Sequence, residues 1–206
     1  MPNLYNKYIL PKITNAACSS SPSMKQRQKI VPLAYGNVLE VGVGSGLNFK
    51  YYDPTKVDRL FALDPSEEMW AIAKKKYENS PLNTEFTKGY AEEIPLDSNT
   101  IDSIVITYTM CTIPDVEASL MEMRRVLKTH GVLIFCEHGI APDKSVQRWQ
   151  KLLNPIWKNL GGGCNLNRDI PKMIVEGGFN INNLETMYIP GFKPASYNYW
   201  GVAKPR

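Results

Sequence analysis

The stretch Val38–Asn48 constrains the fold of this chain more than any other. Apolar or β-branched residues fill most of positions 38–43, which predicts a buried β-strand. Three glycines occupy alternate positions from its end, Gly42, Gly44 and Gly46. Glycine adopts positive φ angles without strain and lets a ligand approach the backbone closely. A strand that leads through such a turn into a helix forms a nucleotide-sized cleft at its carboxyl end.

An acidic residue follows at a spacing suited to ribose recognition. Asp64 ends a second apolar run and lies 22 residues after Gly42. A carboxylate there can accept hydrogen bonds from both ribose hydroxyls. A dinucleotide fingerprint needs G-x-G-x-x-G, but its third glycine would fall at Leu47. The spacing therefore argues against a nicotinamide dehydrogenase, and failure to bind NAD would exclude that function.

Strand-like and helix-like patterns alternate through the rest of the chain. Further strands are expected at 60–64, 84–87, 101–107, 131–136, 179–188 and 197–203. Helices are expected to begin after Ser66 and Asp115, and another is expected to break near Pro155. Such alternation predicts an α/β fold with a parallel, doubly wound sheet.

The leading segment differs in charge from the remainder. The net charge is +4, and residues 1–39 contain five basic and no acidic residues, so the rest is close to neutral. A nucleic-acid-binding surface needs a strong basic stripe, and the nearly neutral part of the chain after residue 39 does not supply one. No nucleic-acid partner is therefore expected. The basic arm is either a solvated helical surface or a contact for a membrane surface or an anionic substrate.

Two helices are expected before the glycine turn. One covers 3–18, kinked or interrupted at Pro11, and the other covers 23–34. We therefore divide the chain into an N-terminal helical lid, 1–35, and a domain that contains the glycine turn, 36–206; simple packing of the two helices is the alternative. No apolar run is long enough to span a bilayer, and no signal-peptide pattern is present, so a cytoplasmic protein is expected.

The four cysteines are widely scattered, at positions 18, 111, 136 and 164. None forms a C-x-x-C pair, and the two histidines, His130 and His138, do not complete a metal pattern. We therefore predict reduced thiols and no metal site.

Several stretches resemble, in order, the motifs of class I S-adenosylmethionine-dependent methyltransferases. They lie at 40–46, 63–69, 91–96, 101–104 and 124–131. The resemblance implies a Rossmann-like, seven-stranded sheet that is mostly parallel, with one antiparallel strand near the C-terminus. It also implies S-adenosyl-L-methionine as cofactor and S-adenosyl-L-homocysteine as product.

The same resemblance assigns cofactor contacts residue by residue. The residues expected to bind or border the cofactor are Glu40, Gly42, Gly44, Gly46, Asp64, Pro65, Met69, Ala91, Glu92 and Thr107. One position departs from the family pattern: many relatives have an acidic residue before Ala91, where this chain has Tyr90. Either Glu92 takes the contact to the adenine amino group, or backbone groups and stacking hold the ring.

Further motifs are similar to the thiol S-methyltransferase branch of the methyltransferase-like proteins. They lie at 48–51, 107–113, 136–138, 153–157 and 163–168. The resemblance implies methyl transfer to a small-molecule acceptor, with a thiol as the first choice. An N- or O-methyltransferase acting on a lipid amine or quinone-like acceptor is the alternative, because one fold serves many substrates. A cofactor-binding module without catalysis is the third possibility.

His138 is the expected catalytic residue. It follows a strand at the end where active sites gather, and its ordinary pKa lies near 6.5, which suits a general base. A thiol acceptor must react as the thiolate, so a group that accepts its proton would raise the rate. The alternative is that His138 only packs or hydrogen-bonds to the backbone.

Overall fold

A computed structural model describes residues 9–78 and 80–206. The seven strands are β1 (Gly36–Val41), β2 (Val57–Asp64), β3 (Thr84–Lys88), β4 (Ile101–Thr107), β5 (Leu127–His138), β6 (Phe179–Tyr188) and β7 (Tyr197–Pro205). The α-helices are α1 (Leu10–Cys18), α2 (Ser21–Ile30), α3 (Glu67–Tyr77), α4 (Val116–Val126), α5 (Lys144–Leu160) and α6 (Ile170–Glu176). Short 3₁₀ turns lie at η2 (Val31–Leu33), η3 (Phe49–Tyr51) and η4 (Lys193–Ala195).

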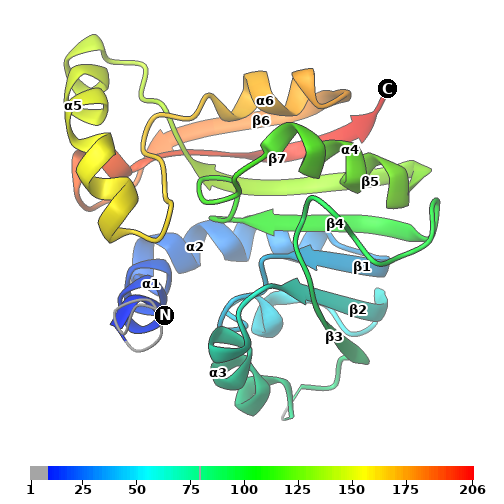
Figure 1. The fold of residues 1–206 in the computed structure, drawn as a ribbon. Helices are drawn as coiled ribbons and strands as arrows, with labels where there is room; N and C mark the ends of the chain where they lie inside the picture. Colours follow the sequence, from blue (N-terminus) through cyan, green and yellow to red (C-terminus); the bar gives the residue numbers. More distant parts are fainter. Residues whose placement is uncertain (1–8, 79) are drawn as a thin grey trace.

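The strands form one sheet in the order β3-β2-β1-β4-β5-β7-β6 (Figure 1). All neighbouring pairs from β3 to β5 are parallel, whereas β7 runs antiparallel to both β5 and β6. The prediction of a mostly parallel, seven-stranded sheet with one antiparallel strand near the C-terminus is therefore confirmed.

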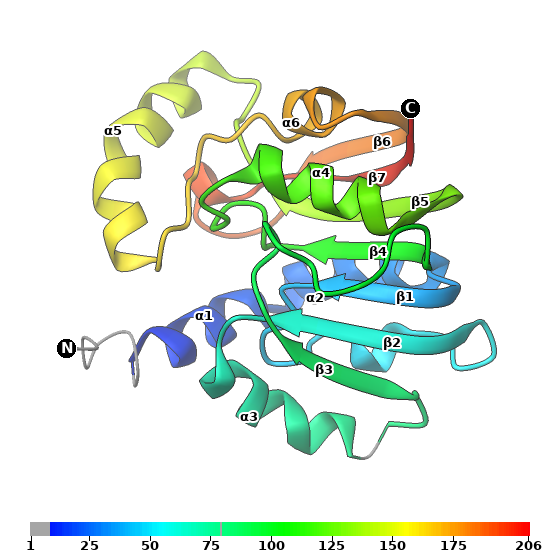
Figure 2. The same cartoon turned by 45° about the vertical axis from the view of Figure 1, so that its right-hand side comes forward.

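Side-chain alternation along the strands builds two cores, one on each face of the sheet. In β1, Val38 packs into one core, while Leu39 and Val41 pack into the other. Residues of α2 and α3 join the first core, and residues of α4 and α6 join the second. Figure 2 shows these helices in two layers around the sheet. Because β1 lies between β2 and β4, its carboxyl end opens at the centre of the sheet's edge.

Local sequence signals set the starts of two helices. Ser66 Oγ accepts a hydrogen bond from Met69 N at 3.2 Å, and Asp115 Oδ1 accepts one from Ala118 N at 3.0 Å. Both side chains satisfy a backbone donor that has no partner inside the helix. These two predicted caps are confirmed.

The predicted break near Pro155 is wrong, because helix α5 continues through this residue. The interruption predicted at Pro11 stays a prediction, because α1 begins only at Leu10. Pro155 is exposed, as is Lys151 one turn before it, so water can solvate the carbonyl that proline leaves unbonded. Pro11 lies in the first turn of α1, where a backbone donor is not needed. Residues 3–8 of the predicted first helix lie outside the described residues.

The second leading helix is earlier and shorter than expected. It spans Ser21–Ile30 and is followed by the 3₁₀ turn Val31–Leu33, because Pro32 cannot donate to the preceding turn. Across 9–78 and 80–206, no helix has the length and apolar composition needed to cross a membrane.

Candidate active site

The glycine turn and the end of β2 are joined directly by hydrogen bonds. Gly44 N donates to Asp64 Oδ2 at 2.8 Å, and Gly42 N donates to the Leu63 carbonyl at 2.8 Å. Gly42 has a φ of 72°, and a Cβ there would lie 2.3 Å from Thr109 Cγ2. A side chain at this position is therefore excluded both by backbone conformation and by space.

Asp64 is buried and points its carboxylate into this turn. Its Oδ1 accepts a hydrogen bond from Ser66 N at 2.8 Å, so each carboxylate oxygen holds one backbone amide. Burial raises the pKa of Asp64, while the amides of Ser66 and Gly44 act in the opposite direction. Each oxygen keeps a further lone pair for a hydroxyl donor.

A cleft of about 380 Å³ opens at the carboxyl ends of β1, β2 and β4. Eight of the ten predicted cofactor residues line it: Gly42, Gly44, Asp64, Pro65, Met69, Ala91, Glu92 and Thr107. Glu40 and Gly46 are not part of this lining. The fold therefore gathers most of the predicted cofactor residues around one space, although their contacts to a cofactor remain predictions.

Glu40 lies beneath the turn in a buried hydrogen-bond network. Its carboxylate accepts hydrogen bonds from Tyr52 Oη at 2.8 Å and from Asn48 Nδ2 at 3.0 Å. Burial raises the pKa of Glu40 to about 7, against the opposing effect of these donors. Glu40 thus supports the turn through Asn48 and Tyr52.

Arg27 of α2 reaches the same network and also lines the cleft. Its side chain is only 4% exposed, and its Nη1 donates to Asn48 Oδ1 at 2.9 Å and to Thr107 Oγ1. Its Nε is buried without a hydrogen-bond partner, and no carboxylate of the described residues forms an ion pair with it. The sequence pattern placed Arg27 only in a basic arm, and the helical spacing gave no sign of its burial.

Helix α1 contributes to the cleft as well. Thr14, Asn15 and Cys18 are among the lining residues, and Ser45 Oγ donates to Asn15 Oδ1. Gly162, which follows α5, also lines the cleft and lies against Leu10. The first helix and the segment after α5 therefore meet at the rim of the cleft. Figure 1 shows α1 next to the C-terminal end of α5.

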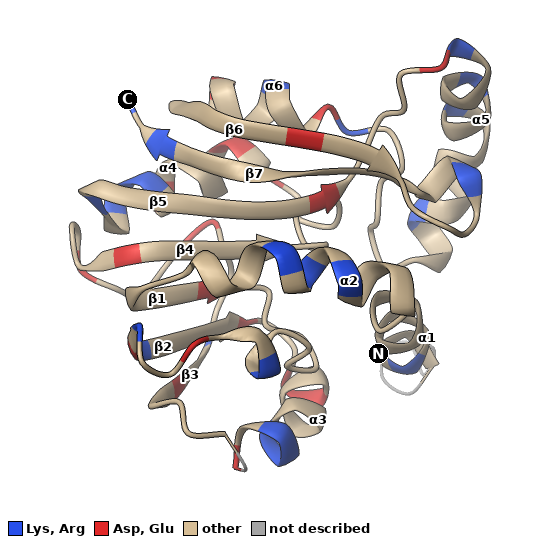
Figure 3. Ribbon diagram, turned by 180° about the vertical axis from the view of Figure 1, so that it is seen from behind, with Lys and Arg blue, Asp and Glu red and all other residues tan. Residues whose placement is uncertain are grey.

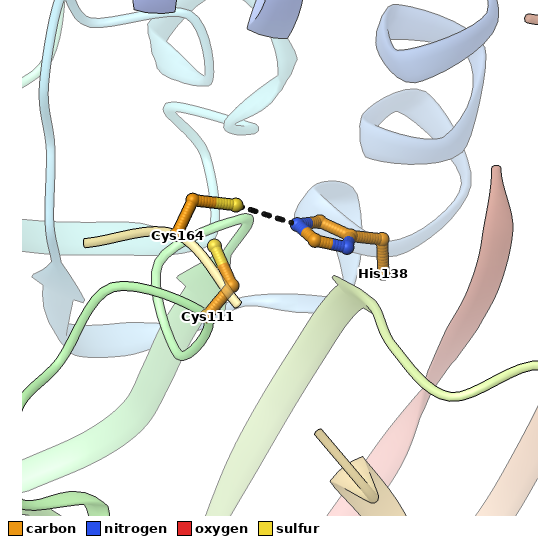
Figure 4. Close-up of side chains that lie close together, drawn as sticks. All are labelled: Cys111, His138 and Cys164. Atoms are coloured by element: carbon orange, nitrogen blue, oxygen red, sulfur yellow. Dashed lines mark hydrogen bonds between the residues drawn. The ribbon is translucent and has the colours of Figure 1, made fainter. Parts of the chain in front are cut away.

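His138 does not line the cleft. It lies buried at the end of β5, and its Nε2 is 3.3 Å from Cys164 Sγ, with Cys111 beside them (Figure 4). The neighbouring carboxylate of Glu137 accepts hydrogen bonds from Thr109 N at 2.8 Å and Met110 N at 3.1 Å, which fixes the loop that carries Cys111. The chain thus brings a histidine and two distant cysteines into one cluster.

The titration behaviour of this cluster is unusual. The hydrogen bond with Cys111 and a further one with His138 lower the pKa of the Cys164 thiol, although burial opposes them. Burial lowers the pKa of His138, but its hydrogen bond and charge interaction with Cys164, together with the charge of Glu137, outweigh burial and raise the pKa overall. Burial raises the pKa of Glu137 to about 7. The Oε2 of Glu137 and the Nδ1 of His138 are buried, and neither has a hydrogen-bond partner among the residues that the structure describes.

Comparisons with known proteins agree with this geometry. Residues 39–135 match a methyltransferase domain family. The chain is 35% identical over 151 residues to thiol S-methyltransferase TMT1B of Rattus norvegicus, covering 72% of this chain and 62% of that protein. It is 34% identical over 183 residues to the Homo sapiens protein of the same name, covering 86% of this chain and 74% of that protein. The chain thus spans about three-fifths of the rat relative's length.

Solved structures share the fold at low sequence identity. A putative methyltransferase in complex with the Trm112 activator of Haloferax volcanii has a TM-score of 0.71 at 17% identity, covering 98% of this chain and 96% of that one. The methyltransferase CalH, solved with S-adenosylhomocysteine, has a TM-score of 0.66 at 21% identity, covering 96% of this chain and 59% of that one. Three observations agree: the glycine turn that faces Asp64, the order of the strands in the sheet and the similarity to these relatives. They show that the chain belongs to the class I S-adenosylmethionine-dependent methyltransferases and resembles their thiol S-methyltransferase branch.

Proposed function

We propose that this methyltransferase transfers the methyl group of S-adenosylmethionine to the sulfur of a small thiol. The proposal that the cleft binds S-adenosylmethionine rests on the hydrogen bond from Gly44 N to Asp64 Oδ2. The thiol is supported by the relatives named thiol S-methyltransferases, which share about a third of their residues with this chain over most of its length.

The cleft residues suit the parts of the cofactor. The ribose hydroxyls would donate to Asp64, and the adenine would lie between Met69 and the segment of Ala91 and Glu92. At the other end, Arg27 is a buried cation with an unpaired Nε, which fits the carboxylate of the cofactor's methionyl group. Among the described residues, Arg27 forms no ion pair that would have to break before it could bind this carboxylate.

The protein's task in this reaction is mainly positioning. S-adenosylmethionine supplies a methyl group already activated on a sulfonium. The chain must hold the acceptor sulfur in line, at about 3–3.5 Å, which can contribute about 7–11 kcal/mol. His138 stays the proposed general base for the acceptor's proton, and because Cys164 lies against its Nε2, it would act next to that thiol rather than from the cleft wall.

The test is incubation of the purified protein with S-adenosylmethionine labelled in its methyl group and a panel of alkyl thiols, amines, phenols and quinols. We expect label only in thioether products, and loss of transfer in Asp64→Ala. Label only in amines or oxygen acceptors would contradict the thiol. Tight cofactor binding with no transfer to any acceptor would support a binding module without catalysis.

A second acceptor class has support of its own. The chain is 33% identical over 142 residues to a phosphatidylethanolamine N-methyltransferase of Cereibacter sphaeroides and 34% identical over 128 residues to a ubiquinone/menaquinone C-methyltransferase of Rickettsia bellii. An N- or O-methyltransferase acting on a lipid amine or quinone-like acceptor is therefore the alternative, and the amine and quinol members of the panel decide it.

The helices of residues 1–35 are proposed to close over the bound cofactor. The contact between Asn15 and Ser45, and the positions of Thr14 and Cys18 on the cleft wall, support this role. Trypsin can cut after the exposed Lys12 of α1. We expect S-adenosylhomocysteine to slow cleavage there; an unchanged rate would favour permanent packing instead of a lid.

Contact with a membrane surface is proposed for the same side of the molecule. Lys12 and Lys25 of the leading helices are exposed, as predicted for a basic arm, although Arg27 is buried in the cleft. Helix α5 adds four basic and no acidic residues (Figure 3). It also carries exposed Trp149 and Ile156. Basic residues combined with exposed Trp and Ile are typical of helices that lie in a membrane interface.

A cytoplasmic location also stays a proposal. All four cysteines of the chain lie within the described residues, and none forms a disulfide. Reduced thiols are typical of a reducing compartment. Recovery of the protein from the lumen of an organelle in cell fractionation would contradict a cytoplasmic location.

A further inference from the structure

The cluster of Cys111, His138 and Cys164 is built from three distant segments. Cys111 follows β4, His138 ends β5, and Cys164 follows α5. Their ligating atoms, two Sγ and one imidazole nitrogen, all lie within 4.8 Å of one another. Figure 4 shows the Cys164 sulfur directed toward the ring of His138 and the Cys111 sulfur directed toward Cys164. This is a convergence of two sulfurs and one nitrogen on a small common volume.

We propose that these three side chains bind a zinc-type divalent cation. Zn²⁺ binds thiolate sulfur at about 2.3 Å and imidazole nitrogen at about 2.0–2.1 Å, so donors around a tetrahedral ion lie about 3.5–3.8 Å apart. The observed separation of 3.3 Å between Cys164 Sγ and His138 Nε2 is close to that spacing. The other two donor separations are at most 4.8 Å, so they would have to shorten by no more than about 1.3 Å for one ion to contact all three donors.

Charge around the cluster favours a divalent cation. Zinc binds cysteine as the thiolate, so Cys111 and Cys164 would lose their protons when the ion binds. Their two negative charges would lie in a largely buried setting. A divalent cation would balance these two charges, and buried charges without such compensation are strongly unfavourable.

The two cysteine loops are tied together by hydrogen bonds. Asn165 N and Nδ2 donate to the Cys111 carbonyl at 2.9 and 3.0 Å, and the same Nδ2 donates to the Gly163 carbonyl at 2.8 Å. Glu137 holds the other side of the Cys111 loop through Thr109 N and Met110 N. The ligand positions are therefore fixed by the fold before any ion binds, which favours a specific site.

The described chain supplies three donors to the proposed ion, and the cluster lies beside the cleft. No fourth His, Cys, Asp or Glu atom within the described chain joins the three within 4.8 Å. Thr112, next to Cys111, and Gly162, close to Cys164, both line the cleft. Cys111 and His138 are buried, while Cys164 is partly exposed. Three protein ligands with a free position are typical of catalytic zinc sites, whereas structural sites have four.

The fourth coordination position of the ion would bind the acceptor thiol. This role rests on the thiol transfer proposed above. An acceptor thiol that occupies this position loses its proton to solvent and is held as the thiolate. An electron pair on its sulfur forms the new bond to the methyl carbon. The bond from that carbon to the sulfonium breaks, and its electrons stay on the departing sulfur, which gives S-adenosylhomocysteine. In this arrangement the cation stabilises the thiolate, and His138 acts as a ligand of the ion instead of as the general base proposed above.

The site is tested first without any methyl transfer. Chelator-treated full-length protein is titrated with Zn²⁺ in competition with a chromophoric chelator, and Co²⁺ is added separately to observe thiolate-to-cobalt absorption. We expect one equivalent of zinc in the wild type and binding weaker by at least about 100-fold in Cys111→Ser and Cys164→Ser. The matched control is Cys136→Ser, a buried cysteine of β5 outside the cluster, which should bind zinc as the wild type does.

Thermal unfolding and S-adenosylhomocysteine binding show whether each variant is folded. Absence of stoichiometric zinc in the wild type, or equal binding in folded Cys111→Ser and Cys164→Ser, would overturn the site. If chelator-treated protein methylates thiols as fast as zinc-loaded protein, the role of the open position is wrong, while the proposed thiol transfer stands. If zinc binds but no thiol is methylated, the proposed function fails, and the site itself is retained.

Discussion

The side-chain amide of Asn48 joins Arg27 to Glu40. Its Oδ1 accepts a hydrogen bond from Arg27 Nη1 at 2.9 Å, and its Nδ2 donates to Glu40 Oε1 at 3.0 Å. The amide therefore stands between a buried cation and a buried carboxyl group and keeps them from pairing directly. Arg27 keeps binding capacity for a negatively charged group in the cleft, and Glu40 stays beneath the glycine turn.

Replacing Arg27 by methionine should weaken cofactor binding. The substitution keeps much of the apolar stem but removes the guanidinium proposed to hold the methionyl carboxylate. Hydrogen bonds to a charged group contribute about 1.5–3 kcal/mol, so we expect the Kd for S-adenosylhomocysteine to rise about 10- to 100-fold by calorimetry. Lys25→Met, an exposed cation of the same helix, is the control and should leave the Kd unchanged. Equal affinity of Arg27→Met and wild type would remove Arg27 from the cofactor site.

Asp64→Asn tests the ribose contact without emptying the site. The asparagine side chain has the same size, but an NH₂ group replaces one of the two accepting oxygens. This NH₂ donor would face other donors, either the backbone amides or the ribose hydroxyls. We expect at least about a tenfold loss of affinity for S-adenosylhomocysteine and a lower melting temperature, because a buried donor is left unpaired. The exposed-loop variant Asp97→Asn should change neither the affinity nor, by more than a degree or two, the melting temperature. Retained affinity in Asp64→Asn would contradict the ribose assignment.

Glu40 should make the protein less stable as the pH rises toward neutrality. Burial raises its pKa in the folded state to about 7, from an ordinary value of 4.5. The folded state therefore binds more protons than the unfolded state between these values, and the free energy of unfolding falls with pH across that window. The contribution is fully present below pH 4.5 and is lost above about pH 7, with a size on the order of 3 kcal/mol.

The measurement is the urea unfolding free energy at several pH values between 5 and 8, without cofactor. Glu40→Gln keeps an acceptor for Asn48 and removes the titration, so its slope should be shallower than that of the wild type. Burial also raises the pKa of Glu137 to about 7, so a smaller slope should persist. Identical slopes in variant and wild type would show that Glu40 is ionised in the folded protein throughout the window.

Local patterns predicted the centre of the cleft well, since its geometry depends on neighbours in sequence or in adjacent strands. The turn at Gly42 and the carboxylate of Asp64 follow directly from two consecutive strand ends. Arg27 was missed because its partner Thr107 is 80 positions away, and helical spacing does not report such contacts. Pro155 was misjudged because solvent exposure, which spacing does not reveal, relieves the cost of a missing hydrogen bond.

The cysteine and histidine cluster shows the same limit. Metal motifs are recognised in sequence when the ligands are close together, as in C-x-x-C. Here the separation from Cys111 to Cys164 exceeds 50 residues, and only the return of the chain after α5 brings them together. The spacing therefore predicted no metal site, although the folded chain assembles a set of donors suited to one.

Removing exposed apolar side chains from α5 should weaken association with anionic membranes. Trp149 is 58% exposed and Ile156 63% exposed, on a helix with four basic and no acidic residues. Inserting such side chains into an interface removes apolar area from water at about 25 cal/mol per Å², while the basic residues attract anionic headgroups. We expect the double variant Trp149→Ser, Ile156→Ser to bind phosphatidylserine-containing vesicles at least about tenfold more weakly than the wild type in co-sedimentation.

The matched control lies on α4, which covers a face of the sheet away from the cleft rim. Met121 is 58% exposed, the same fraction as Trp149, so Met121→Ser removes an equally exposed apolar side chain from another surface and should leave vesicle binding unchanged. Phosphatidylcholine vesicles separate the two forces, because they offer the apolar interface without the anionic charge. If the protein stays monomeric and binds neither vesicle type, membrane contact is contradicted. If the wild type forms a concentration-dependent dimer that the double variant does not form, a second copy of the chain covers α5 instead.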